Sequence, residues 1–163
     1  MDAARWLHHL LHAPVSRRYS PEAMAAIQQA IAEGEVRHDG ELCFVAEAKL
    51  PMRFLIGGRG ARTRAGDLFA RLRVWDTHRR GGVLVYVLLA DRAIEIIADR
   101  GVAARVPAPG WDGVMRVMQE RFQQDDWTGG ALAGIKAAHV LLARYLPPTP
   151  GKRHELPDKP LLL

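Results

Sequence analysis

The feature that most constrains the fold of this chain is a pair of apolar, β-branched segments near its middle. Val83–Ala90 and Ile94–Ala98 are separated by a short break at Asp91–Arg92. This pattern predicts a β-hairpin. Because the first segment carries no charged residue, its strand is expected to be buried on both faces, which places the hairpin at the centre of the fold.

The residues before the hairpin predict one helix, one strand and a connecting helix. Ser20–Glu22 supplies a cap, a proline at the first helical position and an acidic first turn. The helix that begins there is expected to end at the His38–Gly40 turn, before a strand over Glu41–Ala48. Apolar residues from Leu68 to Trp75 return to helical spacing. A strand, a crossover helix and a second strand favour a parallel pair, so the sheet is expected to be mixed.

Two further helices are predicted, one from Trp111 to Phe122 and the last from Thr128 to Tyr145. The fold class is therefore α/β, a small mixed β-sheet flanked by helices on both faces in the order helix, strand, helix, strand, strand, helix, helix. We expect an N-terminal helical arm over residues 1–19 and one domain over 20–147. The prolines of residues 148–163 predict a mobile C-terminal tail.

The last predicted helix contains three glycines, Gly129, Gly130 and Gly134. A glycine inside a helix costs about 1 kcal/mol relative to alanine, so something must compensate. We interpret them as a close approach of this helix to the sheet, with backbone contact to a ligand as the alternative.

The composition of the chain excludes several classes of function. The formal charge is +5, but the basic residues are scattered, and no basic stripe alternates with aromatic residues, so nucleic acid is not expected as a partner. No apolar run approaches the roughly 18 residues of a membrane-spanning helix, and no secretory signal pattern is present. The chain is expected to be soluble and cytoplasmic. The single cysteine, Cys43, excludes a thiolate zinc cluster and is expected to be a buried thiol without nucleophilic activation.

Three segments resemble the TPM domain family. They are residues 38–42, the hairpin of residues 82–101, and residues 122–135, which combine a phenylalanine, an acidic–aromatic stretch and a glycine-rich helix start. The closest likeness is to the short, soluble bacterial version of the domain. The resemblance implies a helix-flanked central sheet and divalent-metal binding. It also implies either acid-phosphatase activity, as claimed for plant members, or a role in assembling or modulating membrane complexes.

The best candidate metal ligands are Asp99, Asp125 and Asp126, which lie in predicted loops that end a strand or begin a helix. Such loops can offer the several oxygen ligands that Ca²⁺ or Mg²⁺ prefers. Arg80 and Arg100 are candidates for binding an anion. The alternative interpretation is that Asp126 caps a helix or complements its dipole, that Asp99 pairs with Arg100 or forms a turn, and that the arginines form surface ion pairs. No organic cofactor is expected.

Other motifs carry weaker signals. His8 and His12 have the four-residue spacing of a zinc-binding helix but lack the glutamate between them, so an amphipathic arm is the favoured interpretation. The glycine-rich segment of residues 57–60 lacks the lysine and hydroxyl of a phosphate-binding loop and is interpreted as a flexible connection. No nucleophile motif is found, so no catalytic residue is assigned.

The leading hypothesis is therefore a non-enzymatic accessory or interaction module that serves a protein or a membrane-associated complex, with a divalent metal as a further expectation. The alternative is a metal-assisted phosphatase with an ion on the three aspartates and phosphate held by Arg80 or Arg100. A third hypothesis is peripheral membrane contact through residues 6–12.

Overall fold

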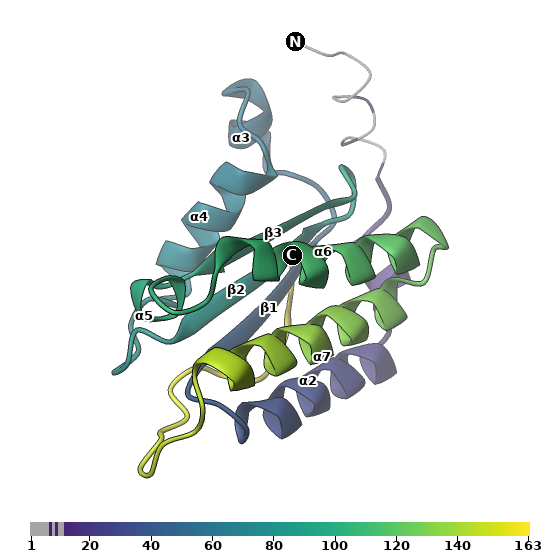
Figure 1. Ribbon diagram of the computed structural model, residues 1–163. Helices are drawn as coiled ribbons and strands as arrows, with labels where there is room; N and C mark the ends of the chain where they lie inside the picture. Colours follow the sequence, from purple (N-terminus) through teal and green to yellow (C-terminus); the bar gives the residue numbers. More distant parts are fainter. Residues whose placement is uncertain (1–6, 8, 10–11) are drawn as a thin grey trace.

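The structure, a computed structural model, describes Leu7, His9 and residues 12–163. Its centre is a four-stranded sheet with helices on both faces, so the predicted α/β class is confirmed (Figure 1). The strand order is β3-β2-β1-β4. The strands are β1 (Glu41–Glu47), β2 (Gly82–Leu88), β3 (Ala93–Ala98) and the short β4 (Leu161–Leu162).

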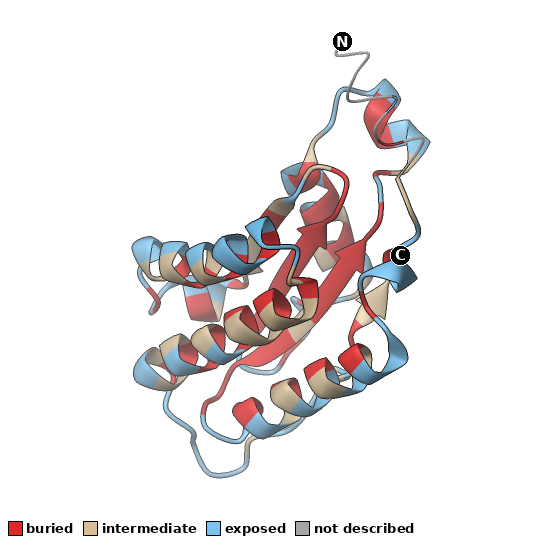
Figure 2. Ribbon diagram, turned by 90° about the vertical axis from the view of Figure 1, so that its right-hand side faces the viewer, coloured by how far each residue is buried: buried red, intermediate tan, exposed pale blue. Residues whose placement is uncertain are grey.

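The sheet is mixed, as the sequence predicts. β1 pairs in parallel with β2, and β2 pairs antiparallel with β3. Every residue of β2 is buried, which agrees with a hairpin whose first strand has both faces covered (Figure 2). The turn between β2 and β3 includes Arg92, which has a positive φ of 48°.

Alternate residues of the strands enter two separate cores. On one face, α2 (Pro21–Glu35), α6 (Ala108–Gln123) and α7 (Trp127–Tyr145) pack on the sheet; on the other lie α3 (Met52–Ile56) and α4 (Ala61–Arg71) (Figure 1). Phe44 and Val85 belong to the first core, and Val45 and Leu84 to the second. The period of two along each strand produces this division.

The start of α2 follows the sequence signal, but its end does not. Ser20 caps the helix, with its Oγ accepting a hydrogen bond from the Ala23 N–H at 3.2 Å. The helix ends at Glu35 rather than at Gly40. The His38 side chain explains the early end, because its Nδ1 accepts from the Gly40 N–H at 3.0 Å and shapes the turn into β1.

Two short elements complete the chain: the 3-10 turn η1 (Val15–Arg17) and helix α5 (Arg100–Ala103). In the part of the chain that the structure describes, no helix combines the length and apolar character needed to cross a bilayer. The expected cytoplasmic location stays a prediction.

The C-terminal segment, which the sequence suggested was mobile, packs along the sheet. We call residues 148–163 the strap. Near its end, Leu161 pairs in parallel with Val45 of β1, and the Leu163 N–H donates to the Ala46 carbonyl at 3.0 Å. The prolines do not prevent this, because they lie before the two residues of β4. The strap therefore closes the outer edge of β1.

Two of the three glycines of α7, Gly130 and Gly134, contact α6 rather than the sheet, whereas Gly129 lies against the capping side chain of Asp126. A Cβ added at Gly130 would lie 2.4 Å from the Phe122 ring, and one added at Gly134 would lie 2.3 Å from Met118. Both of these neighbours belong to α6. The expectation of a close helix–sheet approach is therefore corrected to a close helix–helix approach.

Candidate binding site

The three aspartates predicted to bind a metal do not lie together: Asp99 lies at one end of the sheet, and Asp125 and Asp126 lie at the other. The Asp99 N–H donates to the carbonyl of the first residue of β2 at 2.9 Å. Asp125 and Asp126 lie in the α6–α7 turn, beside the hairpin turn, where Arg92 donates to the Phe122 carbonyl at 3.4 Å. The seven residues of β2 separate these ends by about 20 Å, so the three carboxylates do not converge on one ion.

Asp99 lies beside the two arginines predicted to bind an anion. Its Oδ1 accepts from the Arg100 N–H at 2.7 Å and caps α5. The Gly101 N–H donates to the Arg80 carbonyl at 3.1 Å, which brings the backbones of the two arginine segments together. Both arginines are exposed. The anion proposal for Arg80 and Arg100 stays a prediction. Asp99 caps a helix, a role that the sequence analysis did not assign to it.

Asp125 and Asp126 shape the turn between α6 and α7. The Trp127 indole N–H donates to Asp125 Oδ1 at 2.8 Å, and Arg18 pairs with the same carboxylate, so both contacts lower the Asp125 pKa. Asp126 caps α7 through the Gly129 N–H at 2.8 Å, and this hydrogen bond lowers its pKa. These hydrogen bonds already use oxygens that an ion would need.

The described residues of the N-terminal arm reach the end of the sheet where the parallel strands finish. His9 is fully buried; its Nδ1 accepts from the Leu50 N–H at 3.2 Å and its Nε2 donates to Asp91 at 2.8 Å. The predicted His8–His12 pair and the predicted membrane contact through residues 6–12 lie partly outside the described residues. His9 nevertheless fixes the arm beside the residues that follow β1.

An apolar hollow of about 580 Å³ opens at this end of the sheet. It lies between the arm, the loop after β1, helix α3 and the end of the strap. Lys49, His9 and His12 contribute polar atoms, whereas most of the wall is apolar: Pro14, Val15, Ala48, Leu50, Pro51, Met52, Leu55 and Leu163. Ligand sites in open α/β sheets are commonly found beyond the carboxyl ends of the strands, and this hollow has that position.

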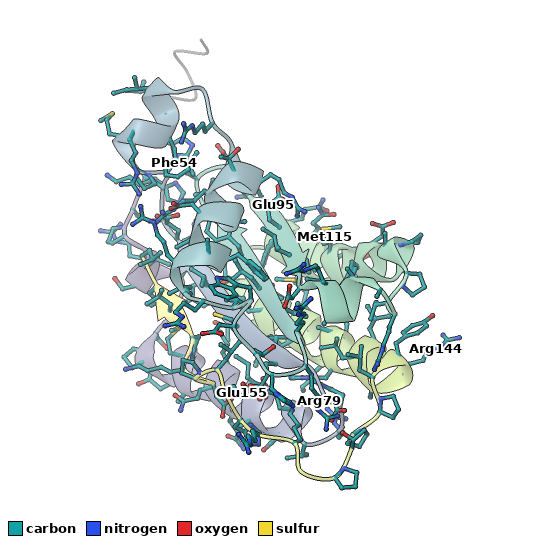
Figure 3. All side chains as sticks on the ribbon, turned by 90° about the vertical axis from the view of Figure 1, so that its left-hand side faces the viewer. Phe54, Arg79, Glu95, Met115, Arg144 and Glu155 are labelled. Atoms are coloured by element: carbon teal, nitrogen blue, oxygen red, sulfur yellow. The ribbon has the colours of Figure 1, made fainter. Side chains whose placement is uncertain are left out.

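The surface around the hollow is also apolar. Met52 is 48% exposed, and Ile56 on the same short helix is 66% exposed. Leu7, on the described part of the arm, is 57% exposed. Figure 3 labels Phe54 of α3 at this end of the molecule. An apolar hollow with exposed apolar neighbours can receive side chains from another molecule.

Sequence patterns alone did not identify the hollow. Its walls come from four segments, and neither Val15 nor Leu163 belongs to a motif. The usable signals were Met52 and Ile56, apolar residues beside a glycine-rich segment. Cys43 is partly rather than fully buried, and desolvation raises the pKa of its thiol to about 11, so the thiol stays protonated at neutral pH.

The strand order and the helices on both faces define an α/β domain with a small mixed sheet. The TPM domain family model matches residues 19–140, and the chain belongs to this family. The resemblance read from the sequence is therefore confirmed. No curated protein gives a significant match.

Solved structures support the same fold. The NMR structure of the BA42 protein from the psychrophilic bacterium Bizionia argentinensis is 28% identical in sequence, with a TM-score of 0.79. The match covers 89% of this chain and 95% of that one. The N-terminal domain of a protein from P. gingivalis is 17% identical with a TM-score of 0.62, over 83% of this chain and 80% of that one, and so shares the fold.

Proposed function

We propose that this TPM domain is a non-enzymatic accessory module that binds a segment of a partner protein in the apolar hollow. The observation that carries the proposal is the position and character of the hollow. The hollow lies beyond the carboxyl end of β1 and has a volume of about 580 Å³. Its walls consist mainly of aliphatic side chains and prolines. Pockets of this size and character bind apolar groups.

The surroundings favour a protein segment over an isolated small molecule. Met52 and Ile56 extend the apolar surface outward along α3. Each buried methylene contributes about 0.8 kcal/mol, so a segment that covers both the hollow and these side chains gains more than a ligand confined to the hollow. Lys49 lines the same hollow and offers a cation to an acidic residue on the partner.

The alternative function is a metal-assisted phosphatase. It needs Asp99, Asp125 and Asp126 around one ion, with Arg80 or Arg100 holding phosphate. Asp99 lies at the end of the sheet opposite the other two aspartates, and all three accept helix-cap or side-chain hydrogen bonds. This arrangement supports the binding role over the hydrolytic one.

Site-specific photo-crosslinking in the native cell tests the proposal. A photoreactive residue at Met52 is expected to give a discrete adduct with another protein, because Met52 both lines the hollow and reaches solvent. The matched control is the same photoreactive residue at Val140, which is 66% exposed on α7. The adduct should be absent from the control and should weaken when Ile56→Glu is added.

Two results would contradict the proposal. Identical adducts from Met52 and Val140 would show that the hollow has no selectivity. Adducts formed only between two copies of this chain would show a homo-oligomeric contact rather than a site for a partner.

A further inference from the structure

One segment of the chain, residues 49–75, carries all of its net positive charge. This segment contains seven lysine or arginine residues and a single acidic residue, Asp67. The whole chain has 23 basic and 18 acidic residues, so the remainder has 16 basic and 17 acidic ones. The basic residues are therefore not evenly scattered, as the sequence analysis assumed. We call the surface formed by residues 49–75 the basic layer.

The fold gathers these residues on one face of the molecule. α3 and α4 cover the face of the sheet opposite α2, α6 and α7 (Figure 1). Figure 3 views the molecule from this side, with Phe54 of α3 labelled at one end and Arg144 of α7 at the other. Six of the seven basic side chains of the layer are exposed: Lys49, Arg53, Arg59, Arg62, Arg71 and Arg73.

The neighbouring carboxylates do not balance these charges. Arg64 is neutralised by Glu47 in the interior. Asp67 accepts hydrogen bonds from Arg64 at 2.7 Å and from Arg71 at 2.9 Å. The other described ion pairs of exposed arginines in the layer join Arg53 to Asp67, Arg62 to Glu95 and Arg73 to Asp76. Three carboxylates thus face six exposed cations, which leaves the layer attractive to an anionic surface.

Exposed apolar side chains lie at both ends of α4 within the same layer. Ile56, which precedes α4, is 66% exposed, and Trp75, which follows it, is 48% exposed. Each lies beside an arginine. The Arg73 guanidinium is 6.0 Å from the Trp75 ring, and a Cβ added at Gly57, next to Ile56, would lie 3.5 Å from Arg59 Nε.

This combination favours an anionic membrane surface over a nucleic acid. Both present phosphate groups that arginine binds. Only the membrane also offers acyl chains to an aliphatic side chain such as Ile56, and tryptophan prefers the membrane interface. Stacking on nucleic-acid bases requires several exposed aromatic rings, whereas Trp75 is the one aromatic residue among the large exposed apolar side chains of the described residues.

We propose that the basic layer binds the surface of an anionic lipid bilayer, with Arg59, Arg71 and Arg73 contacting lipid phosphates and Trp75 entering the interface. Such binding combines electrostatic attraction with shallow burial of apolar groups. None of these four side chains lines the apolar hollow, so the hollow stays open to a partner segment.

Co-sedimentation of the purified full chain with lipid vesicles tests the proposal, and needs no partner protein. The chain should bind vesicles of equal parts phosphatidylglycerol and phosphatidylcholine about tenfold more tightly than vesicles of phosphatidylcholine alone. Raising NaCl from about 0.1 M to about 0.5 M should release most of the bound chain, because salt screens the attraction. Equal binding to the two kinds of vesicle, or none to the anionic kind, would overturn the proposal.

Charge variants locate the binding surface. The triple variant R59Q/R71Q/R73Q is expected to weaken binding to the anionic vesicles about tenfold. The matched control removes the same charge from exposed arginines outside the layer: R105Q/R116Q/R144Q. It should weaken binding less than about threefold, because charges beyond the Debye length of the lipid surface are screened. Thermal unfolding shows that both variants fold. Equal losses of binding would mean that net charge alone attracts the chain, which contradicts a defined surface.

Tryptophan fluorescence tests the position of Trp75. Anionic vesicles should shift the emission of the chain to shorter wavelength, because the exposed indole leaves water. The shift should be lost in W75F and kept in W6F. A shift that is lost in W6F and kept in W75F would move the contact to residues 6–12 and overturn the assignment to the basic layer.

A DNA duplex of mixed sequence serves as the competing polyanion. At the same salt concentration, an excess of duplex should leave the chain on the anionic vesicles, because DNA offers no apolar phase to Ile56 and Trp75. Release of the chain onto the duplex would identify nucleic acid as the preferred partner, and the assignment to lipid would then be wrong.

Discussion

Arg64 and Glu47 form a bidentate ion pair in the interior of the molecule. Arg64 Nε donates to Glu47 Oε2 at 2.9 Å, and Arg64 Nη2 donates to Oε1 at 2.7 Å. The Tyr86 hydroxyl donates to the same Oε2 at 2.7 Å. The two charged side chains are only 8% and 5% exposed, so each depends on the other for compensation.

The first prediction is that Arg64→Met destabilises the fold by about 3–5 kcal/mol, because it leaves the Glu47 carboxylate buried without its cation. Urea unfolding measures the free energy of unfolding. The double variant Arg64→Met/Glu47→Gln keeps an acceptor for Tyr86 and removes the buried charge, so it should be more stable than Arg64→Met. A double variant that is less stable would contradict this account.

The second prediction concerns the contact between α6 and α7. Gly130→Ala should destabilise the fold by about 1–3 kcal/mol, because the new methyl group would meet the buried Phe122 ring and, at 3.2 Å, the Met118 carbonyl. Gly113→Ala on α6 is the matched control. Its Cβ would meet nothing within 4 Å, so higher helix propensity should raise stability by up to about 1 kcal/mol. Equal effects of the two substitutions in thermal unfolding would refute the packing argument.

The third prediction is a pH dependence from two buried histidines. His38 Nε2 and His139 Nδ1 lie 2.7 Å apart, and burial lowers the pKa of His38 to about 3 and that of His139 to about 4. Unfolded histidine has a pKa of about 6.5, so below that pH the unfolded chain binds more protons than the folded chain. Their contribution to stability is therefore complete above pH 6.5 and is lost as the pH falls toward 4.

Each histidine adds at most about 1.4 kcal/mol per pH unit to this dependence. Glu35 acts in the opposite direction between about pH 4.5 and 7, because burial raises its pKa to about 7. The informative measurement is therefore a comparison of His139→Gln with the unaltered protein. Between about pH 4.5 and 6, the substitution should reduce the slope of unfolding free energy against pH by an amount that corresponds to at most one proton. An unchanged slope would exclude His139 as a neutral buried group.

The fourth prediction separates capping from catalysis at Asp126. Asp126→Ala should lower the melting temperature, because it removes the cap of α7 and the ion pair with Arg121. Asp126→Asn should unfold close to the unaltered protein, because asparagine is an equally good cap. Neither substitution should change the background hydrolysis of a generic phosphomonoester with Mg²⁺ or chelator. Hydrolysis that Mg²⁺ supports and Asp126→Asn abolishes would restore the phosphatase hypothesis.

Most of the fold could be predicted from sequence signals that involve only neighbouring residues. The β-branched run of β2 and the Ser20 cap of α2 depend on neighbouring residues and can be recognised from them. β4 could not be recognised in this way, because two leucines have no periodicity and Leu161 finds its partner Val45 far away in the sequence. The close contact of Gly130 with α6 is also tertiary, so the sequence indicates a close approach but not the partner.

The sites were harder to predict than the fold. Asp99, Asp125 and Asp126 have the residue types of a metal site, yet the register of the hairpin places Asp99 apart from the other two. The apolar hollow carries no motif either, because Val15 and Leu163 line it from opposite ends of the chain. Residue type is visible in a sequence, whereas convergence depends on the folded path of the chain.

Strand β1 obtains both of its neighbours from distant parts of the polypeptide. Val45 pairs with Tyr86 on one side and with Leu161 on the other. Each pairing requires the long stretch of chain between the paired residues to close into a loop, and this costs entropy before the pairing stabilises the sheet. Refolding should therefore be slow compared with that of a helical bundle of the same size. Whenever the pairing with β4 is absent, the backbone amides and carbonyls on that side of β1 are open to other chains, so we expect loss of this pairing to promote aggregation.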